Sequence, residues 1–66
     1  MKLVVNGKPV ELPDGSTVSA LLGQLQIDGV RVAVERNQDV VPRRTWDSVS
    51  LREGDQIEIV TFVGGG

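Results

Sequence analysis

Hydrophobic and polar residues alternate at the beginning of the chain with the two-residue period of a β-strand. Two such stretches, residues 2–5 and 8–12, flank Asn6 and Gly7, which both tolerate the positive φ of a tight hairpin turn. We therefore expect a β-hairpin. Its inner face would carry the alternate hydrophobic residues Leu3, Val5, Val10 and Leu12. Pro9 lacks an N–H and so places the second strand at the border of the sheet.

The spacing then changes to that of an α-helix. Hydrophobic residues recur at i, i+3, i+4 and i+7 and form one stripe of Val18, Leu21, Leu22 and Leu25. Ser16 or Thr17 can cap the start of this helix, Ile27 closes it, and Asp28-Gly29 ends it. Gly23 costs the helix about 1 kcal/mol relative to alanine. Packing against the sheet must therefore stabilise it.

The second half of the chain alternates again. Residues 30–36 have the pattern of a half-buried strand, and Val40-Val41 begins a short partner segment that Pro42 stops. Trp46 lies in an irregular stretch and is expected to cover an edge of a small core. After a turn at Glu53-Gly54-Asp55 the last strand follows, formed by residues 56–62.

The last strand leaves one question open. If Ile57 and Ile59 face the core, alternation sends Val60 and Phe62 to the opposite, solvent side. The pair would then be an exposed patch, extended by Val4 of a neighbouring strand, and a candidate docking surface for a protein partner. Alternatively, a twist or bulge turns Phe62 inward.

Composition limits the classes of function. The 66 residues make one small domain, with 39% hydrophobic and 24% charged residues. Because the chain has no Cys and no His, thiolate nucleophiles, imidazole bases and soft-metal sites are excluded. The net charge of −2 and dispersed arginines predict no nucleic-acid partner. The short apolar runs predict neither a membrane span nor a signal peptide, so we expect a cytoplasmic protein. We also expect the free protein to be a monomer. Arg43 and Arg44 could steer it toward acidic partners or form a solvated basic pair.

The final residues are Gly64, Gly65 and Gly66. Glycine has no Cβ, so such a run can pass through a channel too narrow for any side chain. A terminal carboxylate has a pKa of about 3.3 to 3.7 and is ionised at neutral pH, hence a poor electrophile that needs activation before it reacts. The alternative is an inert, frayed end.

This order of elements resembles the ubiquitin-like β-grasp fold, which is α+β with one main helix across a mixed sheet of four to five strands. At the level of residues the chain resembles the ThiS family. The resemblance is carried by the stretches 3–8, 32–37, 41–43 with Trp46, 53–59, and Gly65-Gly66. It implies a β-grasp domain over residues 1–63 and a flexible glycine tail over 64–66.

The resemblance further implies a sulfur carrier of thiamine biosynthesis that is not itself an enzyme. An adenylating enzyme of the ThiF type would activate the Gly66 carboxylate with ATP and Mg²⁺, which this chain does not bind. Sulfur from a cysteine desulfurase system would then give a thiocarboxylate, which donates sulfur to thiazole synthase, ThiG. In this scheme Gly66 carries the reacting group, while Gly64 and Gly65 thread into partner active sites.

Three other functions stay open at this point. A similar carrier could serve molybdopterin synthesis, as MoaD does, or tRNA thiolation. A ubiquitin-like modifier would join its end to a lysine of another protein. A plain β-grasp interaction module would have an inert tail. An independent enzyme is disfavoured, because no spacing pairs a nucleophile with a base.

Overall fold

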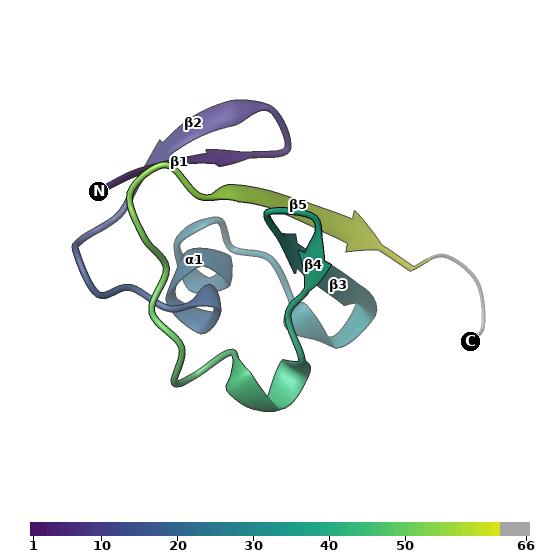
Figure 1. Ribbon diagram of the computed structural model, residues 1–66. Coiled ribbons are helices and arrows are strands. Elements are labelled where there is room, and N and C mark those ends of the chain that lie inside the picture. Colours follow the sequence, from purple (N-terminus) through teal and green to yellow (C-terminus); the bar gives the residue numbers. More distant parts are fainter. Residues whose placement is uncertain (63–66) are drawn as a thin grey trace.

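The computed structural model describes residues 1–62 and shows a five-stranded sheet with an α-helix against one face (Figure 1). The elements, in chain order, are β1 (Lys2–Val5), β2 (Lys8–Glu11), α1 (Val18–Gln24), the 3₁₀ turn η1 (Gly29–Arg31), β3 (Val32–Arg36), β4 (Asp39–Val40), the 3₁₀ turn η2 (Arg43–Thr45) and β5 (Gln56–Thr61). The strand order in the sheet is β2-β1-β5-β3-β4.

The last strand occupies the centre of the sheet. It runs parallel to β1 and antiparallel to β3, so β5 is paired on both sides along its first half. The β1–β2 hairpin forms one border, as Pro9 predicted, and the short β4 forms the other. The helix lies under the middle of the sheet, and the opposite face is open (Figure 1).

The core lies between the sheet and α1. Its members are the hydrophobic residues Leu3, Val5, Leu12, Val18, Leu21, Leu22, Val32, Val34, Trp46, Leu51 and Ile57. The predicted hairpin face and most of the helical stripe belong to it, and Val10 and Leu25 pack against it partly buried. No helix within residues 1–62 combines the length and the hydrophobicity needed to cross a membrane.

The helix is shorter than the sequence predicted. Its N-cap is Thr17, whose hydroxyl accepts from the Ala20 N–H at 3.2 Å, but it ends at Gln24 and not at Ile27. Gln26 takes a positive φ of 58°, which breaks the helical path. The early end lets the chain turn so that Gly29 packs on Trp46, where an added Cβ would lie 3.0 Å from the ring.

The third strand also begins later than predicted, because a 3₁₀ turn precedes it. Residues 29–31, counted in part as strand in the sequence pattern, form η1, and the Asp28 carboxylate accepts from the Val30 N–H at 2.9 Å. Val30 is consequently 73% exposed. The hydrophobic alternation that predicted a strand from residue 30 holds only from Val32 onward.

Candidate functional site

The predicted reacting group lies outside the described residues. Gly66, with the threading residues Gly64 and Gly65, follows the part of the chain that the structure describes. What the structure provides is the strand that leads to them, β5, and the open face of the sheet around it. These features define the candidate site.

The open face carries the two hydrophobic side chains predicted for it. Val60 is 50% exposed and Phe62 is 53% exposed, so the alternative in which Phe62 turns into the core is wrong. The Phe62 N–H donates to the Arg31 carbonyl at 2.7 Å, which continues the β3–β5 ladder past the last strand residue. Alternation along a regular strand therefore exposes Phe62, with no bulge to redirect it.

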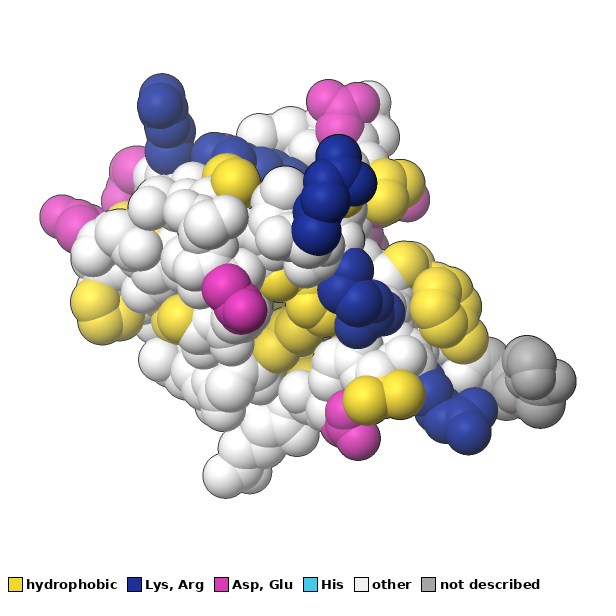
Figure 2. Space-filling model, turned by 90° about the horizontal axis from the view of Figure 1, so that it is seen from below, with side chains coloured by type: hydrophobic (Ala, Val, Ile, Leu, Met, Phe, Trp, Pro, Cys, Tyr) yellow, Lys and Arg dark blue, Asp and Glu magenta, His cyan; other side chains and the backbone are white. Residues whose placement is uncertain are grey.

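A hollow lies beside the exposed Phe62 ring. Ala33 stands opposite Val60 in the β3–β5 register. A hollow of about 170 Å³ is bounded by Phe62, Ala33, Val40 and Pro42, among others. Figure 2, which views the molecule from the side of α1 and η2, shows hydrophobic and basic side chains exposed together at the edge where β5 finishes. This end therefore presents an apolar surface with positive charge close by.

Val4 lies at a distance from Val60 and Phe62. It is 37% exposed and on the same face, but its register partner on β5 is Gln56. Val60 lies four positions after Gln56, which corresponds to roughly 13 Å along a strand. The sequence also missed Val40, which is 67% exposed and pairs with Glu35 on the open face. A two-residue strand is too short for alternation to show which side chain faces outward.

Two asparagine side chains hold β5 in place. The β1–β5 pairing ends at Val5 and Ile57, and the Asn6 side chain takes over, accepting from the Ile59 N–H at 2.7 Å and donating to its carbonyl at 3.2 Å. At the start of β5, Asn37 accepts from the Gln56 N–H at 3.0 Å. Both asparagines lie in hairpin turns with positive φ. Each turn thereby extends the ladder on which β5 depends.

Asp55 forms a buried polar centre beside Asn37. Its carboxylate accepts from Arg36 Nε at 2.7 Å, from the Asn37 side chain at 3.1 Å and from the Arg52 N–H at 2.8 Å. Burial by itself raises the pKa of Asp55, but these hydrogen bonds and the Arg36 charge outweigh it and hold the pKa below the ordinary value of 3.8. The ionised form is thus the one that the fold selects.

Acid should therefore destabilise the protein through Asp55. A lowered pKa in the folded state means that the stabilisation is fully present above the unfolded-state pKa and is lost as the pH falls through the folded-state value. Urea unfolding between about pH 5 and pH 2 should show a fall in the free energy of unfolding, steepest below the ordinary carboxyl range. The Asp55→Asn variant should show a flatter profile, and an identical slope would contradict this assignment.

Arg43 has a structural role. Its guanidinium lies 4.3 Å from the centroid of the Trp46 ring and donates to the Val32 carbonyl at 2.9 Å. It also donates to the Gly29 carbonyl, so it joins η2 to the segment that enters β3. Trp46 is 7% exposed and its indole N–H donates to the Val41 carbonyl at 3.0 Å. Arg43 is therefore not a solvated member of a basic pair with Arg44, because its guanidinium is bound to the backbone and to Trp46.

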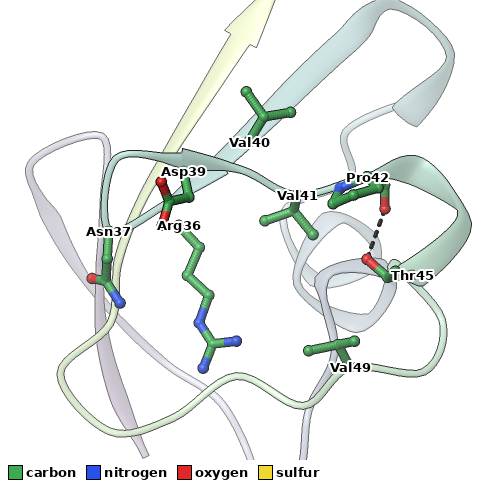
Figure 3. Close-up of a pocket in the computed structure, with 8 residues that line it drawn as sticks. All are labelled: Arg36, Asn37, Asp39, Val40, Val41, Pro42, Thr45 and Val49. Atoms are coloured by element: carbon green, nitrogen blue, oxygen red, sulfur yellow. Dashed lines mark hydrogen bonds between the residues drawn. The ribbon is translucent and has the colours of Figure 1, made fainter.

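A larger hollow of about 410 Å³ lies under β4, between Arg36 and η2. Figure 3 shows Val40 and Val41 pointing in opposite directions; both contribute to the lining of the hollow, together with Val49. The Thr45 hydroxyl donates to the Pro42 carbonyl at 2.7 Å. Its hydrogen is therefore committed to the backbone, and nothing in this lining pairs a nucleophile with a base.

A mixed sheet of this order, with one helix across one face and the C-terminal strand at its centre, defines a ubiquitin-like β-grasp domain. The solved ThiS structure from Geobacter metallireducens superposes with a TM-score of 0.80 and 36% identity, covering 100% of both chains. The sequence model of the ThiS family matches residues 3–66. The chain belongs to the ThiS family.

Curated relatives are of two sizes. The sulfur carrier protein ThiS of Bacillus subtilis is 42% identical over 65 residues, which are 97% of this chain and 98% of that protein. A thiazole synthase of Paramagnetospirillum magneticum is 48% identical over 66 residues, all of this chain but only 20% of that protein. The chain thus spans about one fifth of the length of the thiazole synthases that it matches.

Proposed function

We propose that this chain is a sulfur carrier of thiamine biosynthesis that offers the Gly66 carboxylate as its reacting group. The observation that carries the proposal is the match, over nearly the whole of both chains, to a protein named as a sulfur carrier. The end of β5 supports it, because this strand finishes away from α1 and the residue that follows it, Phe62, is exposed (Figure 1).

The chemistry requires activation by a partner. The carboxylate attacks the α-phosphorus of ATP on a ThiF-type adenylating enzyme, with Mg²⁺ there, and pyrophosphate leaves. A sulfur nucleophile then attacks the acyl carbon and AMP leaves, so the thiocarboxylate keeps one oxygen and gains one sulfur. In the cell a cysteine desulfurase would supply the sulfur. This chain contributes a carrier group and no catalytic side chain.

Thiazole synthase is the proposed recipient of the sulfur. The support is that proteins of that name contain a segment similar to the whole of this chain. Val60 and Phe62 are the proposed docking residues. We add Val40 because it is exposed on the same face, and Val4 as an outlying contact. The Phe62 ring, exposed just before the glycine run, would anchor the carrier while the run enters the active site.

Intact-mass spectrometry tests the proposal. The chain is incubated with ATP, Mg²⁺, sulfide and a ThiF-type enzyme, and its mass should rise by about 16 Da when sulfur replaces oxygen. Omission of ATP should prevent the change. Conjugates of high mass formed in cell extract would instead indicate a protein modifier, and an unchanged mass with active enzyme would overturn the proposal.

A further inference from the structure

Two carboxylates of like charge face each other at the centre of the open face. Glu35 on β3 and Glu58 on β5 are register partners. Side chains directly opposite in antiparallel strands have Cβ atoms about 4.5–5.5 Å apart, and like charges there are destabilising. Within residues 1–62 the salt bridges involve other groups, Met1 with Asp14 and Arg36 with Asp55. The repulsion between the two glutamates is thus not offset by an ion pair within the described chain.

Like charges are not paired at the border of the same sheet. At the border, Lys2 on β1 pairs with Glu11 on β2, so opposite charges meet there. A lysine at either glutamate position would give the central pair the same attraction. The central pair is also framed by hydrophobic side chains, since Val40 is the β4 partner of Glu35 and Val60 follows Glu58 on the same face.

We propose that Glu35 and Glu58 together receive one arginine side chain of the protein surface that docks on the open face. This rests on the proposed function, in which Val60 and Phe62 dock on a partner, and it adds the chemistry of that partner. The partner presents a guanidinium surrounded by apolar side chains. A guanidinium is weakly hydrated and donates to two carboxylates at once. The apolar frame excludes water and strengthens the attraction.

Charge complementarity is the reason to choose this occupant. Before docking, the two carboxylates repel each other, and one cation between them removes that repulsion and adds two attractions. A second copy of this chain is a poorer fit, because its own open face would bring another glutamate pair against the first. The partner is therefore a different protein, and thiazole synthase is the one to test.

The test measures binding of the full chain to purified thiazole synthase from the same organism by titration calorimetry. Glu35→Gln and Glu58→Gln should each raise Kd several-fold, and the double variant should raise it about tenfold or more. The wild-type Kd should rise with ionic strength, and the double variant should lose most of that dependence. Thermal midpoints of the variants should equal or exceed that of the wild type.

Asp39→Asn is the matched control. It removes one negative charge from an exposed residue of β4 whose register partner is Arg36, on the other face from Glu35. Its Kd should stay at the wild-type value. The inference would be overturned if the wild type did not bind, or if the double variant had an unchanged Kd. It would also be overturned by an equal rise of Kd in Asp39→Asn, or by self-association that the double variant abolishes. Thiocarboxylate formation by the wild type, measured by mass, tests the proposed function separately.

Discussion

Replacing Gly65 with valine should abolish adenylation of the chain end and leave the β-grasp body folded. Adenylation requires the Gly66 carboxylate to reach the α-phosphorus of ATP inside another enzyme, and a β-branched side chain one residue earlier widens the chain that must enter. Misplacement by about 1 Å can cost about 100-fold in rate. We expect kcat/KM for the carrier in pyrophosphate exchange to fall by about that factor or more, with Gly65→Ala less affected.

Gly23→Ala provides the control for this substitution. A Cβ at Gly23 would meet nothing within 4 Å, and the residue lies in α1, away from the exposed end of β5. Alanine there should raise the free energy of unfolding by up to about 1 kcal/mol and leave adenylation unchanged. Normal turnover of Gly65→Val, with a thermal midpoint equal to the wild type, would refute the narrow-channel account of the glycine run.

The sequence predicted the elements whose determinants are local. Asn6 and Gly7 adopt the positive φ values of 49° and 80° that a tight hairpin turn demands, so the hairpin followed from two residues. The stripe on α1 and the alternation in β5 were likewise visible within a few neighbouring positions. The exposed Phe62 followed from the same alternation, once a bulge could be excluded by the structure.

Features that depend on distant partners could not be predicted. The packing of Gly29 against Trp46, which follows the helix end at Gln24, joins residues that lie far apart in the chain. The structural role of Arg43 could not be predicted without knowing where the Val32 carbonyl lies. A basic residue beside a proline gives no local indication of that contact. The opposition of Glu35 and Glu58 needs the register of two strands more than twenty residues apart, which periodicity does not provide.

The stretches that carry the family resemblance prove to be partly structural. Arg36 and Asn37 come from one such stretch, and Asp55 and Gln56 come from another. The structure joins them, since Arg36 and Asn37 both donate to Asp55, while Asn37 also accepts from the Gln56 N–H. These motifs therefore fix the start of β5. They set the position of the strand that precedes the glycine run.

Replacing Asp55 with alanine should accordingly be among the most destabilising changes in the chain. It leaves the Arg36 guanidinium, the Arg52 N–H and the Asn37 amide without their acceptor in a site where Asp55 is only 7% exposed. Loss of one partner of a buried, hydrogen-bonded pair costs about 3 kcal/mol or more. A domain of this size has roughly 3–10 kcal/mol in total, so a large fraction of its stability should disappear.

Urea unfolding of Asp55→Ala, Asp55→Asn and Asp39→Ala measures this cost. Asp39 is exposed, and its removal should change the free energy of unfolding by no more than about 0.5 kcal/mol. Asp55→Asn keeps one acceptor oxygen and the shape of the side chain, so its loss should fall between the other two. A cost for Asp55→Ala no larger than that of the Asp39 control would mean that β5 is positioned without this carboxylate. The side-chain hydrogen bonds of Asn6 and Asn37 to β5 would then suffice.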